Sequence, residues 1–115
     1  MTNQLNDIPL TEHFRLREFE CRCCHRVRLS PKLLFCLEAF RTLWGKPVIL
    51  SSGYRCEAHN RAVGGSPRSL HMTGQAADIL VSFAEQPAAE LLAAKAGFSG
   101  VLSYGRRNFM HLSVG

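Results

Sequence analysis

The sequence predicts a single α+β domain in which helices cover one face of a small antiparallel sheet. Three observations lead to this fold class: two amphipathic stretches with clear helix boundaries, four short strand-like stretches, and no linker or repeat within the 115 residues. A chain of this length forms one domain with a modest hydrophobic core. We expect the domain to span residues 1–115, with an irregular lead-in over residues 1–29 and the core over residues 30–115.

Three stretches are predicted to form helices. The first follows Ser30, starts with a proline and ends at Gly45, and these are the usual boundary signals of a helix. A short helix is expected within residues 56–65 and an alanine-rich one within residues 86–100. In the first helix, Cys36 shares an apolar stripe with leucine and phenylalanine residues, so we expect its side chain to be buried.

Four stretches are predicted to form strands, namely residues 47–54, 75–81, 100–105 and 108–114. In the second and the fourth, apolar side chains alternate with others and share one face, which the helices are expected to cover. Asp78 and His111 then project from the opposite, open face. If the two strands are neighbours, these side chains lie side by side. The apolar set is Ala77, Ile79, Val81, Met110, Leu112 and Val114.

A third candidate metal ligand, His71, lies seven residues before Asp78. Seven extended residues span roughly 23 Å, so the chain must double back, and Gly74 tolerates such a turn. With His111, the set offers two neutral imidazoles and one carboxylate, which suit Zn²⁺ and leave a fourth position for water. Such a site lowers the pKa of water and polarises a carbonyl, the chemistry of amide hydrolysis. On spacing alone, an ordinary polar surface pair remains the alternative.

The charge of the chain favours an anionic partner. The formal net charge is +5 and the pI is about 9.3, which suits nucleic acid, a phospholipid surface or a bacterial wall polymer, or serves solubility alone. The first residues carry neither the basic nor the apolar region of a secretory signal, and no apolar run is long enough for a membrane span. We therefore expect synthesis in the cytoplasm and no membrane insertion.

Five cysteines, an odd number without a secretory signal, indicate mostly reduced thiols and not a disulfide framework. Cys21 and Cys24 have the spacing of a zinc knuckle, but a structural site usually needs a second pair. Cys36 and Cys56 are isolated in the sequence. A zinc-finger-like site is therefore not favoured, although the sequence leaves open whether Cys23 or Cys24 approaches Cys56 in space.

Three separated motifs, in this order, resemble the zinc D-Ala-D-Ala peptidase family, which includes murein endopeptidases and phage lysins. They are S-G-Y-R at Ser52–Arg55, S-x-H-x-x-G-x-A-x-D at Ser69–Asp78, and F-x-H at Phe109–His111. The stretches HFRLREFECRCC and LEAFRTLWGKPVILSSGYR are also similar to the family, so the resemblance covers nearly the whole chain. It implies a hedgehog/D-Ala-D-Ala-peptidase-like fold with a zinc site on the open face.

The resemblance also implies a role for each motif. His71, Asp78 and His111 are expected to bind one zinc ion. Arg55 is expected to act in catalysis and substrate binding, because a guanidinium can bind a substrate carbonyl or carboxylate and stabilise oxyanion charge. Ser69 is expected to hydrogen-bond substrate. The implied protein is a D,D-carboxypeptidase or murein endopeptidase that acts on peptidoglycan stem peptides and reaches the wall as a phage or prophage lysin. Independently of the resemblance, we expect a monomer.

Two positions depart from the family pattern. Members of the D,D-peptidase group carry an acidic residue three before the last ligand, where this chain has Asn108, and an amide cannot accept a proton from water. Other members carry Asp two residues after that ligand, where this chain has Ser113. Strand alternation places Ser113 on the site face, so we predict it as a catalytic group that holds His111 or the water.

The missing carboxylates leave alternatives for the function. Glu57 or Glu85 can enter the site from a loop, or the chain is a catalytically weak or inactive zinc-containing module that binds the cell wall or belongs to a virion. A basic nucleic-acid binder built on the CRCCH stretch is disfavoured, because the arginines are scattered along the chain and a second cysteine pair is missing.

Overall fold

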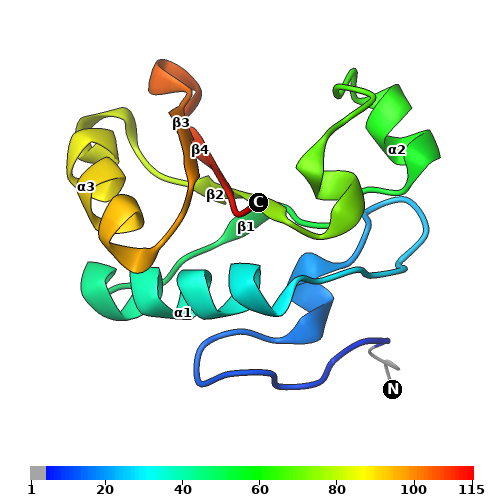
Figure 1. Ribbon diagram of the computed structural model, residues 1–115, viewed down its shortest axis with the longest axis horizontal. Coiled ribbons are helices and arrows are strands. Elements are labelled where there is room, and N and C mark those ends of the chain that lie inside the picture. The colour runs from blue at the N-terminus through cyan, green and yellow to red at the C-terminus, as the bar shows by residue number, and fades with distance from the viewer. Residues whose placement is uncertain (1–4) are drawn as a thin grey trace.

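The computed structural model describes residues 5–115 and shows four strands and three α-helices within them (Figure 1). Four 3-10 turns connect or precede these elements. The helices are α1 (Pro31–Trp44), α2 (Glu57–Ala62) and α3 (Gln86–Ala96), the strands are β1 (Leu50–Ser52), β2 (Ala76–Leu80), β3 (Gly100–Ser103) and β4 (Phe109–Ser113), and the turns are η1 (Leu16–Phe19), η2 (Leu70–Thr73), η3 (Phe83–Glu85) and η4 (Gly105–Arg107).

The four strands form one antiparallel sheet with the order β1-β2-β4-β3. The last strand therefore lies inside the sheet, between β2 and β3, so that β2 and β4 are direct neighbours. Asp78 stands opposite His111 in this pairing, and Ile79 stands opposite Met110. The predicted antiparallel sheet and the predicted juxtaposition of Asp78 and His111 are confirmed, whereas the likeness to hedgehog-type domains stays a prediction.

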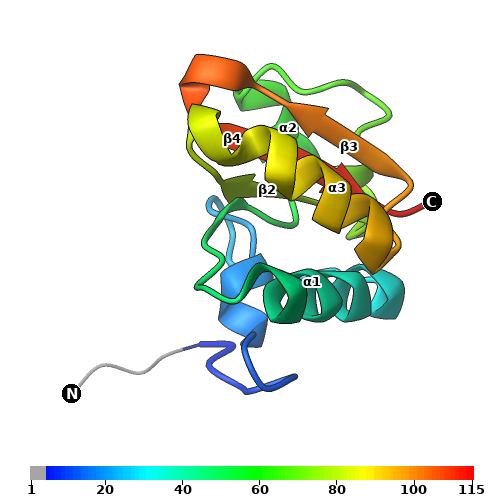
Figure 2. The same ribbon diagram turned by 90° about the vertical axis from the view of Figure 1, so that its left-hand side faces the viewer.

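Helices α1 and α3 pack against each other and against one face of the sheet. Figure 1 shows α1 below the strands and α3 on their left, with α2 at the far right. Figure 2 shows α3 lying alongside β3 with α1 beneath. The core contains the alternating apolar residues of β2 and β4 and the valine that follows each strand, as predicted. These are Ala77, Ile79, Val81, Met110, Leu112 and Val114.

The predicted boundaries of the first helix are confirmed. Helix α1 begins with a proline after Ser30 and ends at Gly45, which adopts the left-handed conformation at φ 73°. Cys36 is buried on the face of α1 that packs into the core. Strand β1 is shorter than the predicted 47–54, because beyond its end the backbone turns toward the N-terminal segment. There the Tyr54 N–H donates to the Phe19 carbonyl over 2.8 Å.

The lead-in is part of the folded core, which corrects the expected boundary at residue 30. Phe14 and Phe19 are each only 1% exposed and belong to the hydrophobic cluster. Gly53 allows the close approach of this segment, since a Cβ atom there would lie 2.7 Å from the backbone of Phe19. His13 adds a polar contact of 2.5 Å between its Nδ1 atom and Oε2 of Glu38 on α1. The segment is irregular because tertiary contacts, and not a repeating hydrogen-bond pattern, hold it in place.

Across residues 5–115, none of the helices has the length and apolar character that a membrane crossing requires.

Candidate metal centre

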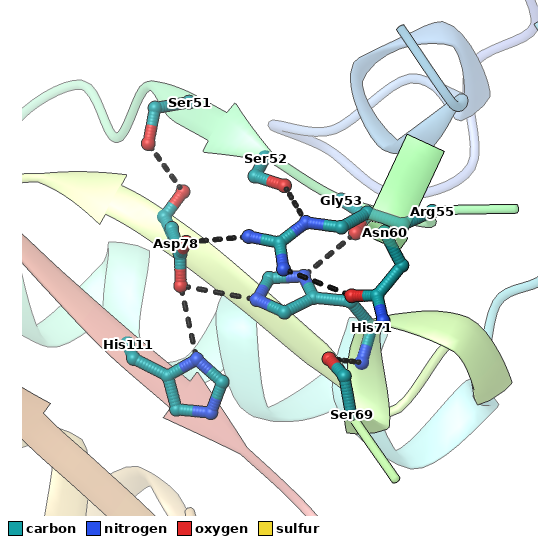
Figure 3. Close-up of polar contacts among 9 residues, drawn as sticks. All are labelled: Ser51, Ser52, Gly53, Arg55, Asn60, Ser69, His71, Asp78 and His111. Atoms are coloured by element: carbon teal, nitrogen blue, oxygen red, sulfur yellow. Dashed lines mark hydrogen bonds and ion pairs between the residues drawn. The ribbon is translucent and has the colours of Figure 1, made fainter. Parts of the chain in front are cut away.

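His71, Asp78 and His111 meet on the open face of the sheet (Figure 3). Nε2 of His71 lies 3.2 Å from Oδ1 of Asp78, and Nδ1 of His111 lies 3.0 Å from the same oxygen. One candidate ligand atom from each residue lies within 4.8 Å of the other two. The three side chains come from η2, β2 and β4, so the structure brings together the set that the sequence predicted.

The turn that carries His71 back to the sheet depends on Gly74. Residues Leu70–Thr73 form the 3-10 turn η2, and Gly74 ends it in the left-handed conformation at φ 72°. A Cβ atom at this position would lie 2.3 Å from the carbonyl oxygen of Arg28. Backbone conformation and close packing both require glycine here, and the predicted doubling back at Gly74 is confirmed.

A backbone carbonyl orients the imidazole of His71. Its Nδ1 atom lies 2.8 Å from the carbonyl oxygen of Gly53, which can only accept a hydrogen bond, so Nδ1 carries the proton. In the neutral ring the lone pair is then on Nε2, the atom that faces Asp78. The hydrogen bond from Nδ1 to the Gly53 carbonyl thus orients the ring of His71 so that Nε2 can bind a metal.

The carboxyl group of Asp78 is buried and ionised. Burial alone would raise its pKa, but in the protein without metal the hydrogen bonds and the attraction of the His111 and His71 imidazoles, in their doubly protonated form, lower the pKa of Asp78 to about 2. An anionic oxygen therefore faces two imidazole nitrogens at neutral pH.

This donor set fits zinc. Tetrahedral ligands at about 2.0–2.1 Å from the ion lie about 3.4 Å from one another. The two nitrogen–oxygen separations, 3.0 and 3.2 Å, are close to that spacing. Two neutral imidazoles and one carboxylate are also the ligand types of catalytic zinc sites with an open fourth position.

Arg55 reaches the same centre from the loop after β1. Its Nε atom donates to Oγ of Ser52 (3.1 Å), Nη1 donates to Oδ1 of Asn60 (3.3 Å), and Nη2 donates to Oδ2 of Asp78 (3.4 Å). A guanidinium has five N–H donors, so two remain for a ligand. The side chain is 15% exposed and lines the cleft above the three predicted ligands, as predicted for Arg55.

The cleft has a volume of about 370 Å³, and sequence reasoning missed one of its walls. Tyr104 and Phe109 stack with their ring centroids 4.3 Å apart, and the guanidinium of Arg107 lies 5.0 Å from the Phe109 ring. The sequence indicated only a basic turn around residues 105–108. The signal that could have identified this wall is strand alternation, because Phe109 shares a strand face with His111.

The two predicted serines have different positions. Ser69 lines the cleft, and its Oγ accepts a hydrogen bond of 3.2 Å from the backbone N–H of His71. Ser113, at the end of β4, is buried beside its pairing partner Gly100 of β3, where a Cβ atom on Gly100 would lie 2.2 Å from the Oγ of Ser113. Ser113 is not among the residues that line the cleft. The structure therefore does not bring Ser113 to the site, although it shares a strand face with His111.

Among the described residues that line the cleft, Asp78 is the only carboxylate. Asn108 adopts a left-handed conformation after η4, and its Oδ1 accepts a hydrogen bond from the N–H of Phe83. Glu57 pairs with Arg61 on the surface of α2. Glu85 pairs with Lys46. Neither glutamate enters the site from a loop in this structure.

A second group of candidate ligands lies outside the cleft. The sulfur atoms of Cys21, Cys24 and Cys56 are within 4.8 Å of one another, so Cys56, isolated in the sequence, is not isolated in space. Cys36 lies apart, in the core. None of the five cysteines forms a disulfide in this structure.

Comparison with known proteins agrees with the geometry of the cleft. No curated protein matches the chain. The family model described as Peptidase M15 matches residues 12–113, a range that includes His71, Asp78, His111 and Arg55. The match extends over most of the chain, from the lead-in to the last strand, and the chain therefore belongs to the zinc D-Ala-D-Ala peptidase (M15) family.

Proposed function

We propose that this chain is a zinc-dependent peptidase that hydrolyses peptide bonds of bacterial peptidoglycan, as a D,D-carboxypeptidase or a murein endopeptidase. The observation that carries the proposal is the convergence of His71, Asp78 and His111 at a cleft that Arg55 also lines. Membership of the M15 family supports the metallopeptidase class. Delivery to the wall as a phage or prophage lysin belongs to the same proposal.

The residues of the cleft have separate tasks in this reaction. Zinc, when bound, supplies Lewis-acid polarisation of a carbonyl and lowers the pKa of water. Arg55 uses its two remaining N–H donors to bind the substrate carbonyl or carboxylate and to stabilise negative charge that develops on oxygen. Its contact with Oδ2 of Asp78 leaves Oδ1 facing the histidines. Ser69 stands beside His71 on the cleft wall, where it can hydrogen-bond substrate.

The charge and shape of the cleft suit a stem peptide. Arg55 and Arg107 both line it, and their positive charges attract the carboxylates of an anionic peptide. The stacked rings of Tyr104 and Phe109 offer an apolar surface for the short side chains of such a peptide. The net charge of +5 favours approach to the anionic cell wall.

One observation favours a second candidate function. The cleft holds no carboxylate besides Asp78 among the described residues that line it, and general-base catalysis commonly contributes 10²–10⁴-fold, on the order of several kcal/mol. A chain that binds zinc and wall peptide but turns over slowly would serve as a cell-wall-binding or virion-associated module.

Digestion of purified muropeptides by zinc-loaded protein separates the two functions. The peptidase predicts new products whose masses identify the bond that is cut. His71→Ala should abolish their formation, whereas His59→Ala, a histidine of α2 outside the cleft, should retain it.

Zinc-loaded protein that sediments with intact peptidoglycan but releases no product would support the binding module. Full zinc occupancy with neither product nor wall binding would contradict both functions.

A further inference from the structure

Three cysteines from two distant segments of the chain lie close together. One of them, Cys56, directly follows Arg55 in the sequence. Cys21 and Cys24 lie in the turn after η1, and Cys56 immediately precedes α2. Their sulfur atoms are within 4.8 Å of one another, with Cys21 buried and the other two half-buried. The predicted peptidase mechanism uses none of them, and none lines the cleft.

The turn from Cys21 to Cys24 has the closed form of a metal-binding knuckle. The Cys21 N–H donates to the carbonyl of Arg26 (2.7 Å), and the His25 N–H donates to the carbonyl of Cys21 (2.9 Å). His25 adopts a left-handed conformation at φ 61°, which a residue other than glycine rarely adopts. The turn therefore holds the two thiols of a C-x-x-C pair on one side of a tight loop.

Backbone N–H groups surround the sulfur atoms. The N–H groups of Cys23 and Cys56 donate to Sγ of Cys21 over 3.4 and 3.5 Å. The N–H of His59 donates to Sγ of Cys56 over 3.4 Å. Such donors stabilise thiolates and are the usual outer contacts of thiolate ligands at a metal.

We propose that Cys21, Cys24 and Cys56 bind a second, structural zinc ion. Tetrahedral zinc with bonds of about 2.3 Å to sulfur places its thiolates about 3.8 Å apart, within the separation that the cluster shows. Cys23, whose side chain is exposed, lies outside this cluster of three, so the fourth tetrahedral position is left for water. Thiolates select zinc over the hard cations that prefer oxygen ligands.

This ion would join the N-terminal segment to the loop that serves the first metal centre. Within that loop, the Gly53 carbonyl orients His71 and the Arg55 N–H donates to the His71 carbonyl over 3.1 Å. Cys56 is the next residue. Zinc binding that closes a connection between residues 21–24 and Cys56 contributes to folding, and it fixes the backbone on which Arg55 depends.

Cobalt substitution tests this site without a measurement of activity. Co²⁺ bound to thiolates gives an intense sulfur-to-metal charge-transfer absorption, whereas a site of two histidines and an aspartate gives none. The full chain, purified under reducing conditions, is expected to bind two Co²⁺ ions and to show this absorption. His71→Ala should lose one ion and keep the absorption. This result stands whether or not the protein hydrolyses peptidoglycan.

Two cysteine variants give a matched comparison. Cys24→Ser, in the exposed turn, should lose the thiolate absorption and one ion while the ion at His71 is retained. Cys36→Ala changes the cysteine that lies apart in the core and should keep both ions and the absorption.

A full-chain protein that binds only one Co²⁺ ion and shows no thiolate absorption would overturn the proposal. Recovery of the untreated protein with a disulfide that joins Cys56 to Cys21, Cys23 or Cys24 would also overturn it.

Discussion

The Nη2 atom of Arg55 lies 3.4 Å from Oδ2 of Asp78, while Oδ1 of the same carboxylate faces His71 and His111. The two oxygens thus have separate partners, a guanidinium on one side and two imidazoles on the other. Asp78 therefore connects the other two predicted metal ligands, His71 and His111, to the arginine that is proposed to bind substrate. Substitutions on the two sides of this contact should separate metal binding from turnover.

Asp78→Asn is expected to remove the anionic ligand and lower zinc affinity. Changes to partners that merely orient zinc ligands cost about 10–100-fold in affinity, so loss of a ligand should cost more than about 100-fold. Competition with a chromophoric chelator measures the affinity. Asp7→Asn, which neutralises a carboxylate in a surface pair with Arg15, is the control and should bind zinc as the wild type does. Equal affinity in Asp78→Asn would show that Asp78 is not a ligand.

Arg55→Lys is expected to retain zinc and lose turnover. Lysine keeps the positive charge but cannot reproduce the planar set of donors that contacts Ser52, Asn60 and Asp78. Loss of one such oxyanion-stabilising group costs about 10²–10³-fold in kcat. Muropeptide hydrolysis and zinc content are measured together, with Arg61→Lys on the surface of α2 as the control. Unchanged kcat in Arg55→Lys would contradict the proposed role.

The zinc-free protein is expected to lose stability at acid pH through Asp78. Its pKa falls from an ordinary value near 3.9 to about 2 in the folded protein. Because the pKa of Asp78 is lower in the folded state, its ionised carboxylate stabilises the fold fully above the unfolded-state pKa. This stabilisation is lost as the pH falls through about 2. The shift corresponds to about 2 kcal/mol of unfolding free energy. Urea denaturation across this range checks it, and Asp78→Asn should have a flatter pH dependence than the wild type.

Two glycine variants separate backbone strain from steric contact. Gly64 has φ 74° and open space where a Cβ atom would lie, whereas at Gly74, with φ 72°, that atom would lie 2.3 Å from the carbonyl oxygen of Arg28. Gly64→Ala should therefore cost about 1–2 kcal/mol through strain. Gly74→Ala should cost a further 1–3 kcal/mol, roughly, and lower zinc affinity because η2 carries His71. Thermal and urea unfolding measure both, and equal destabilisation would contradict the packing argument.

Ser113→Ala is expected to leave turnover nearly unchanged, because the Ser113 side chain lies against Gly100 and outside the cleft. A change in kcat/KM below about tenfold corresponds to less than about 1.4 kcal/mol. Steady-state kinetics on muropeptides, with zinc content measured in parallel, make the comparison. A loss of about 10²-fold or more, as expected for a general acid or base, would restore the catalytic role that strand alternation predicted for this residue.

Local patterns were sufficient for most of the secondary structure. The boundaries of α1 follow from Pro31 and Gly45, because a proline at the first helical position and a left-handed glycine after the last act within one helical turn. Strand alternation likewise placed Asp78 and His111 on the face away from the helices. The pattern failed for the lead-in, because Phe14 and Phe19 enter the core through contacts with residues far along the chain.

The sequence by itself determined the residue types of the candidate metal site, the strand faces on which Asp78 and His111 lie, and the glycine that turns His71 back to the sheet. Only the tertiary structure decided which other groups reach the cleft. It placed the Ser113 side chain against Gly100 of β3 and held Asn108 in a turn, and it brought Cys56 to Cys21 and Cys24. The physical reason is that alternation and capping act over a few residues, whereas contacts between distant segments depend on how the sheet, the loops and the N-terminal segment pack together.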